Sequence, residues 1–206
     1  MLFRSSAELS DLPSALAALD RQSAAYAERA LAGAGLFNAA DQSHSGEEIT
    51  SRLGASSGRE QIAHRLLEML VEEEALTLTG EVYRSRRALR AEAPVEEAAA
   101  CASRWPALRG AFELLGRCGP KLSEVLRGEE DPLALLFPGG STASSESLNR
   151  DSALARVYGR LASSAVQSWL GSPSCRGRLR ILEIGGGTGG TTSALLEGLQ
   201  IGRAHV

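Results

Sequence analysis

Residues 179–199 read Leu-Arg-Ile-Leu-Glu-Ile-Gly-Gly-Gly-Thr-Gly-Gly-Thr-Thr-Ser-Ala-Leu-Leu-Glu-Gly-Leu. The first six residues, 179–184, form a nearly continuous apolar run of strand length, which is typical of a parallel strand covered on both faces. A glycine-rich turn follows at 185–190, and leucines then recur at helical spacing up to Leu199. A strand, a glycine turn and a helix in this order predict the opening unit of a Rossmann-like α/β fold.

The glycine turn fits two ligand patterns. Gly185, Gly187 and Gly190 satisfy the GxGxxG pattern of proteins that bind NAD(P) or FAD. The same stretch places Glu183 two residues before the first of these glycines, and a carboxylate there would repel a pyrophosphate at the helix N-terminus. That carboxylate suits a ligand with an ammonium and a sulfonium group, and S-adenosylmethionine (SAM) carries both. We favour SAM, with an NAD(P)- or FAD-dependent oxidoreductase as the alternative.

Composition narrows the class of protein. The 206 residues are 43% hydrophobic and 23% charged, with a net charge of -3, as in an ordinary globular protein. The near-neutral charge argues against a nucleic-acid partner, because phosphate neutralisation needs a basic excess. No apolar run approaches the roughly 18 residues of a membrane span, and no signal peptide is present, so we expect a cytoplasmic protein without a membrane partner.

Neither the cysteines nor the histidines suggest a metal site. Cys101, Cys118 and Cys175 are spaced too widely for a metal knuckle, and we interpret them as free thiols. His44 and His64 have no partners at metal spacing and are expected to be ordinary surface or boundary residues. We therefore predict no metal.

The first 90 residues predict helices and one hairpin. An apolar pattern from Leu12 to Leu31 predicts a helix, and Ser57 with Glu60 forms a capping-box pattern before a second helix that reaches Glu74. Residues 76–85 then alternate as a short hairpin. A helix followed by a hairpin is the outline of a winged helix, so an interaction or DNA-binding module is a further alternative.

Residues 91–176 predict a linker and more helices. The stretch 91–100 has the composition of a linker, and helices are expected after Pro106 and after Asp131. Asp151 is a candidate N-cap for the strongest helix of the chain. Its apolar stripe, and Trp105 upstream, are expected to pack in the core; the stripe comprises Leu154, Tyr158, Leu161, Ala165 and Trp169.

Residues 182–192 resemble motif I of class I SAM-dependent methyltransferases. Upstream blocks at 124–128, 131–133, 136–140 and 150–152 resemble the methyltransferase domains embedded in modular polyketide synthases and in hybrids with non-ribosomal peptide synthetases. The resemblance covers most of residues 15 to 200.

The resemblance implies a site and a reaction. The implied cofactor is SAM, its methionine and adenosine parts would lie along the glycine turn, and Glu183 would face its amino group. The methyl group would pass to the α-carbon of a β-ketoacyl thioester bound to an acyl carrier protein through phosphopantetheine, beside neighbouring synthase domains. The implied cofactor-binding residues are Glu183, Gly185, Gly186, Gly187, Thr188 and Gly189.

The arginines near the hairpin are expected to form a solvated face, with an acidic carrier protein as a possible partner. This cluster comprises Arg84, Arg86, Arg87 and Arg90. The triplet Glu72 to Glu74 is likewise expected to be solvated.

These expectations divide the chain into four parts. Residues 1–90 would be a mostly helical, winged-helix-like subdomain, and residues 91–176 a helical linker or lid. Residues 177–200 would begin a Rossmann-like α/β methyltransferase core that is incomplete, because a ribose-binding acid is expected roughly 20 residues past the glycines. Residues 201–206 resemble a translated sequencing adapter. The expectation is a C-terminally truncated domain, inactive alone, whose catalytic residues lie beyond residue 206.

Overall fold

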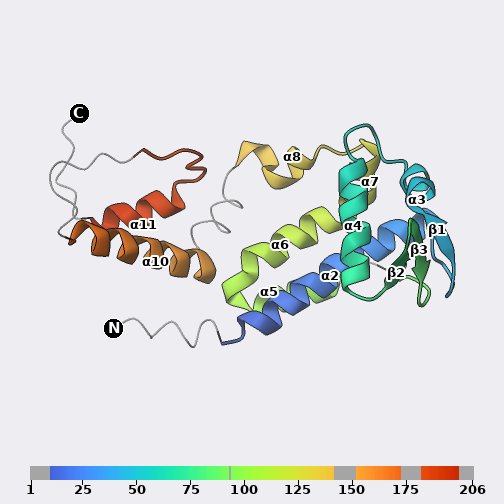
Figure 1. Cartoon of the computed structure of the whole chain (residues 1–206), viewed down its shortest axis with the longest axis horizontal. Helices are drawn as coiled ribbons and strands as arrows, with labels where there is room; N and C mark the ends of the chain where they lie inside the picture. Colours follow the sequence, from blue (N-terminus) through green and yellow to red (C-terminus); the bar gives the residue numbers. More distant parts are fainter. Residues whose placement is uncertain (1–9, 93, 142–151, 173–181, 200–206) are drawn as a thin grey trace.

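The computed structural model describes residues 10–92, 94–141, 152–172 and 182–199 (Figure 1). The expected tail at 201–206 and the first half of the expected strand, residues 179–181, lie outside these ranges. None of the helices within them combines the length and the apolar content needed to cross a bilayer.

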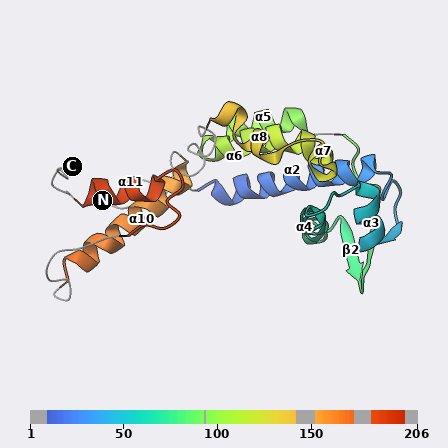
Figure 2. The same cartoon turned by 90° about the horizontal axis from the view of Figure 1, so that it is seen from above.

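A long helix, α2 (Leu12–Gly33), forms the axis of the larger part of the molecule (Figures 1 and 2). Its prediction from the apolar spacing is confirmed. A proline in its first turn suits a position where the backbone N–H has no helical acceptor. The chain leaves the helix through Gly35, whose φ of +75° is readily adopted by glycine.

Next to α2 lie two helices and a small antiparallel sheet. The elements are β1 (Ser43–Ser45), α3 (Gly46–Leu53), α4 (Glu60–Glu72), β2 (Leu76–Thr79) and β3 (Val82–Ser85), and the strand order is β1-β3-β2. The predicted hairpin is confirmed, because Leu76 pairs with Ser85 and Thr79 with Val82 around a turn at Gly80. The name winged helix for this unit stays a prediction.

The predicted capping box before α4 is wrong. The helix begins at Glu60 after Arg59, which caps it with no side-chain hydrogen bond. The Glu60 carboxylate instead accepts a hydrogen bond from the backbone N–H of Gly58 at 2.8 Å. A local turn at Gly58, with φ at +84°, therefore takes the place of the serine cap.

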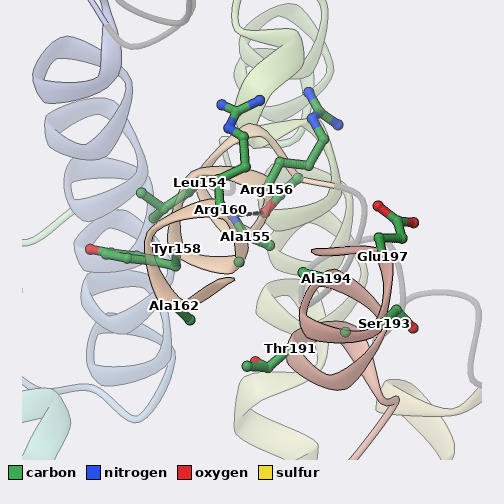
Figure 3. A pocket seen from close by; sticks show the side chains of 13 residues that line it. Leu154, Ala155, Arg156, Tyr158, Arg160, Ala162, Thr191, Ser193, Ala194 and Glu197 are labelled. Carbon is green, nitrogen blue, oxygen red and sulfur yellow. Dashed lines mark hydrogen bonds between the residues drawn. The ribbon is translucent and has the colours of Figure 1, made fainter. Parts of the chain in front are cut away.

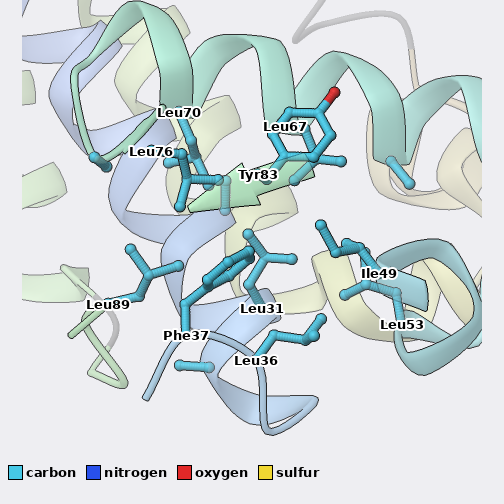
Figure 4. Close-up of a cluster of buried hydrophobic side chains, with 14 of the residues drawn as sticks. Leu31, Leu36, Phe37, Ile49, Leu53, Leu67, Leu70, Leu76, Tyr83 and Leu89 are labelled. Carbon is cyan, nitrogen blue, oxygen red and sulfur yellow. The ribbon is translucent and has the colours of Figure 1, made fainter. Parts of the chain in front are cut away.

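The main hydrophobic core lies where α2, α3, α4 and the sheet meet (Figure 4). Phe37 lies at its centre, fully buried, among leucines from α2, α4 and β2. The large side chains of this core include Leu31, Leu36, Phe37, Ile49, Leu67, Leu70, Leu76 and Tyr83.

The composition of residues 91–100 suggested a linker, but most of this stretch belongs to a helix. A helix, α5 (Val95–Arg104), begins after Pro94, with Glu96 and Glu97 in its first turn. Acidic residues stabilise a helix N-terminus, and the alanines that follow have the highest helix propensity, so alanine richness here indicated a helix.

Helix α5 and the next helix form a second core against the N-terminal half of α2. After a 3-10 turn at Pro106–Leu108, α6 (Arg109–Cys118) runs back along α5. Trp105 stacks on Phe112, with 5.9 Å between ring centroids, so the prediction that Trp105 packs in a core is confirmed.

Short helices complete the larger part of the molecule. After a 3-10 turn at Gly119–Lys121, α7 (Leu122–Arg127) ends at Gly128. The helix predicted after Asp131 is confirmed as α8 (Pro132–Leu136), and the Asp131 carboxylate caps it by accepting a hydrogen bond from the Leu133 N–H at 2.9 Å. A last 3-10 turn spans Pro138–Gly140.

Helices α10 (Ala153–Leu170) and α11 (Gly190–Gly198) form a pair at the opposite end of the molecule from the sheet (Figures 1 and 2). The predicted cap Asp151 lies outside the described residues. Ser152 caps α10 by accepting a hydrogen bond from the Ala155 N–H at 3.1 Å.

A buried ion pair joins α2 to the segment after the hairpin. Glu28 is 1% exposed, and its two carboxylate oxygens accept hydrogen bonds from the Arg87 guanidinium at 2.8 and 2.7 Å. The backbone N–H of Arg90 donates a further bond at 2.8 Å. Burial alone would raise the pKa of the Glu28 carboxyl, but the hydrogen bonds from Arg87 and Arg90 and the charges of both arginines hold it below its usual value. Arg87 and Arg90 are therefore structural residues, against the expectation of a purely solvated face.

We expect Glu28→Gln to lower the free energy of unfolding by about 2 kcal/mol at neutral pH, because it leaves both arginines without their shared carboxylate. The loss is smaller than for a fully buried pair, since Arg87 and Arg90 remain half exposed to water. Urea denaturation measures it. Glu129→Gln, which disrupts an exposed ion pair with Arg127, is the matched control and should change stability little.

The same ion pair should make the free energy of unfolding depend on pH in the acid range. A lowered pKa in the folded state means that Glu28 stabilises the fold above the ordinary glutamate pKa of about 4.3 and loses this contribution as the pH falls through its folded pKa. Below a pH of about 4, wild type should therefore lose more stability than Glu28→Gln. Parallel curves for the two proteins would contradict this assignment.

Candidate functional site

The glycine-rich turn predicted as the ligand site leads directly into α11. Gly185, Gly187 and Gly189 all have positive φ, at +76°, +53° and +72°. The Gly189 N–H donates to the Gly186 carbonyl at 2.8 Å, which closes the turn just before the helix starts. A side chain would be strained at the three positive-φ positions, so the backbone requires glycine here whatever the ligand.

The backbone of this loop is open to a ligand. A Cβ added at Gly185 or Gly189 would meet no atom within 4 Å, and one at Gly187 only the Gly185 carbonyl oxygen at 3.9 Å. Residues 183–187 are exposed, while Thr188 and Gly189 are partly buried. The glycines therefore leave room for a molecule to approach the main chain.

The sequence predicts a strand at 179–184, before the turn. The structure describes residues 182–184 of this segment, and they do not form a strand. Residues 182–184 have no strand structure, and Leu182 and Ile184 are 84% and 88% exposed. A parallel strand needs neighbours for its hydrogen bonds and its two apolar faces. No strand among the described residues lies beside it, so the apolar pattern is present without the sheet that it predicts.

Glu183 is held at the N-terminal end of α11. Its carboxylate accepts a hydrogen bond from the Thr192 hydroxyl. It also covers Gly186, where an added Cβ would lie 3.0 Å from the carboxyl carbon of Glu183. The structure thus brings Glu183, Gly186 and Thr192 together, and a negative group already lies where the helix dipole attracts one.

Thr192 was not among the predicted site residues. The signal in the sequence was a hydroxyl residue in the first turn of the helix after the glycines. Threonine near a helix N-terminus often caps the helix. Only the fold of the loop shows that the Thr192 hydroxyl donates to Glu183 instead.

Helix α11 packs closely on α10 because both contain glycine at the contacts. Gly159 is buried, and a Cβ added to it would lie 2.9 Å from the Ala194 Cβ. One added to Gly198 would lie 2.1 Å from the Ser163 hydroxyl oxygen. Gln167 then donates from its amide to the Gly198 carbonyl at 2.9 Å, which fixes the C-terminal end of α11 on α10.

A groove of about 800 Å³ runs between these two helices (Figure 3). Arg156, Tyr158 and Arg160 project from the α10 side, and Thr191 and Glu197 from the α11 side. The groove begins beside the glycine loop, since Gly190 also lines it. A polar molecule bound at the loop would therefore have this groove next to it.

The apolar stripe on α10 is more exposed than predicted. Trp169 is 52% exposed, and Tyr158 and Leu161 are also exposed, so the expectation of core packing for Trp169 is wrong. Helix α11 covers the face of α10 that carries Gly159 and Ser163. Of the large residues of the stripe, only Leu154 is partly buried.

The arginine cluster near the hairpin forms ion pairs within the chain. Arg84 pairs with Asp41 at 3.0 Å and Arg86 with Glu74 at 3.1 Å, while Arg87 and Arg90 share Glu28. Pairing neutralises these cations, so the cluster offers little free charge to a nucleic acid or to an acidic protein.

The histidines and acidic residues form no metal site in the ranges that the structure describes, where no group of three possible ligands comes together. His44 lies in β1, with Nδ1 2.8 Å from the Glu48 carboxylate and its ring edge-on to Phe37. His64 is exposed on α4.

The fold matches solved methyltransferases. The structure superposes on the CurJ carbon methyltransferase with a TM-score of 0.80 and 29% identity, over 95% of this chain and 56% of that one. It superposes on the DszA carbon methyltransferase with a TM-score of 0.81 and 26% identity, over 96% of this chain and 52% of that one. The chain therefore has a methyltransferase fold.

Sequence relatives include polyketide synthases and the pyochelin synthetase PchF of Pseudomonas aeruginosa, which is 31% identical over 91% of this chain and 10% of that protein. The non-reducing polyketide synthase dpmpA of Macrophomina phaseolina is 34% identical over 146 residues, which are 68% of this chain and 7% of that protein. No protein-family model matches the chain. Taken with the structural neighbours, these similarities place the chain in the family of polyketide synthase methyltransferase domains. The chain spans about half the length of the solved domains and a small part of the synthase.

Two matched glycine substitutions test the packing of α11 on α10. Gly159→Ala and Gly116→Ala give the same gain in helix propensity, but the added Cβ would lie 2.9 Å from Ala194 in the first and an ordinary 3.6 Å from Ala98 in the second. We expect Gly159→Ala alone to speed hydrogen exchange in α11 roughly tenfold, as overpacking forces the helices apart. Equal exchange in the two variants would refute the close contact.

Proposed function

We propose that residues 183–189 and Thr192 form part of the SAM site of a domain that methylates a carrier-bound polyketide intermediate. The observation that carries the proposal is the Glu183 carboxylate, fixed by Thr192 beside an open loop of positive-φ glycines. When bound, SAM supplies an electrophilic methyl group on a sulfonium.

The residues present fit such a ligand. The bare backbone at Gly185, Gly187 and Gly189 admits a flat or bulky group that a Cβ would exclude. A carboxylate held at one end of the loop can accept hydrogen bonds from an ammonium group, directly or through water. We assign Glu183 to the amino group of SAM, and Gly185 to Gly189, including Gly186 and Thr188, to the contacts along the loop.

The same carboxylate argues against the alternative of a dinucleotide. A pyrophosphate would have to approach the N-terminus of α11, where Glu183 already lies hydrogen-bonded to Thr192. The negative charges of the carboxylate and of a pyrophosphate would repel each other there. The paired arginines likewise give no support to a DNA-binding role for the hairpin unit.

For the acceptor we propose the α-carbon of a β-ketoacyl thioester on an acyl carrier protein, within a larger synthase. The two solved structures named above are both carbon methyltransferases, which supports carbon over nitrogen or oxygen. The groove between α10 and α11 offers Arg156 and Arg160 as contacts for the phosphate of the carrier arm. The protein's tasks would be to bind both partners, orient the carbon and exclude water.

A hybrid domain tests the function. We would join residues 1–199 to the part of the CurJ carbon methyltransferase that this chain does not cover and supply SAM with a carrier-bound β-ketoacyl thioester. We expect one methyl group on the α-carbon, located by mass spectrometry. Glu183→Gln should raise the Kd for SAM roughly tenfold, because the ammonium loses a charged acceptor.

The control for this experiment is Glu81→Gln, an exposed glutamate in the hairpin turn, which should leave SAM binding unchanged. Circular dichroism establishes that each hybrid is folded before it is assayed. A folded hybrid that binds SAM equally well with Glu183→Gln would contradict the assignment of Glu183, and methyl transfer to oxygen or nitrogen would contradict the proposed acceptor.

The 206-residue chain alone should not transfer methyl groups. Leu182 and Ile184, on either side of Glu183, are exposed and pair with no strand in the described ranges, so the described part of this segment does not preorganise the loop. Calorimetric titration with SAM should give no micromolar affinity, while the solved CurJ domain serves as the positive control. Micromolar binding or turnover by the chain alone would overturn this expectation.

A further inference from the structure

A small cavity lies between α2 and α5, on the part of the molecule away from the glycine loop. Its volume is about 210 Å³, and it is lined by Arg21, Gln22, Glu97, Cys101 and Trp105. Cys101 is a free thiol and is partly exposed at this cavity. A partly exposed free thiol at a cavity is accessible to a small oxidant.

Gln22 provides a second and independent observation. Its side chain is 4% exposed, yet it lines the same cavity, and its amide Nε2 donates to Cys101 Sγ at 2.9 Å. In the part of the chain that the structure describes, no donor reaches its buried Oε1. A buried acceptor without a donor is unfavourable, so a new donor that reached Gln22 Oε1 would be stabilised by it.

The missing donor is the group that oxidation of the thiol would create. A sulfenic acid carries an O–H on the sulfur, and Gln22 Oε1 belongs to the same amide whose Nε2 already contacts that sulfur. The new hydroxyl could therefore donate to Oε1 while Nε2 keeps its contact. The oxidised cysteine would satisfy a polar group that the reduced one leaves unpaired.

We propose that Cys101 is a site of reversible oxidation by a peroxide, with Gln22 stabilising the sulfenic acid. The sulfur attacks one oxygen of hydrogen peroxide, an S–O bond forms and the O–O bond breaks. The departing hydroxide takes the thiol proton and leaves as water. The sulfur loses two electrons and the peroxide gains them, and a thiol in solution can later reverse the oxidation by forming and then exchanging a disulfide.

Cys118 is the matched control within the same molecule. It is also free and partly buried, but it does not line this cavity. Burial raises the pKa of the Cys118 thiol, against a smaller opposing effect of Arg117, and this disfavours its reactive thiolate. The two cysteines therefore separate the effect of the cavity from that of general exposure to peroxide.

The experiment treats the full chain, carrying Cys175→Ser, with hydrogen peroxide and traps sulfenic acid with dimedone. Peptide mass spectrometry should find Cys101 trapped roughly tenfold faster than Cys118. Gln22→Met, which keeps a side chain of similar length, should lower the yield of trapped Cys101, whereas Gln61→Met on the exposed face of α4 should not.

A measurement on the unsubstituted Gln22 guards against a variant that fails to fold. In the NMR spectrum, the side-chain amide of Gln22 should shift when peroxide is added, and a reducing thiol should restore it. Equal trapping of Cys101 and Cys118 would overturn the proposal. Either an unmoved Gln22 amide or an unchanged yield in a folded Gln22→Met protein would also overturn it.

Discussion

The packing of α2 is the constraint on which the rest of the larger part of the molecule depends. One end of this helix contributes Ala15 and Ala18 to the core shared with α5 and α6. The other end contributes Ala24, Ala27 and Leu31 to the core around Phe37. Alanine at these contacts lets the neighbouring elements approach the helix backbone closely, so both cores are built on a single rigid element.

The same helix carries the charge that fixes the segment after the hairpin. Glu28 lies on α2 and is 1% exposed, and an unpaired carboxylate would be unstable there. It therefore requires Arg87 and the backbone of Arg90, and this requirement determines where the chain runs between β3 and α5. The arginine pattern in the sequence suggested a surface role because the partner lies far away in the chain.

The candidate site illustrates how a local motif and a tertiary site differ. The glycine turn adopts its expected backbone, since positive φ at Gly185, Gly187 and Gly189 depends mainly on the residues themselves. The strand before it does not form in the described residues, because strand structure needs hydrogen-bonding neighbours that the motif does not contain. Glu183 turns instead toward Thr192 of the following helix.

The sequence by itself determined the long helix, the hairpin, the short helix after Asp131 and the glycine turn, along with the resemblance to a family. These features depend on spacing, caps and backbone preferences within a few residues. Tertiary structure alone decided that the helix at 95–104 packs against α2 and α6 and that Arg87 and Arg90 hold Glu28. It also decided that Gly159 faces Ala194 and that Trp169 lies exposed. The physical reason is that burial and ion pairing depend on partners distant in sequence, which no local pattern specifies.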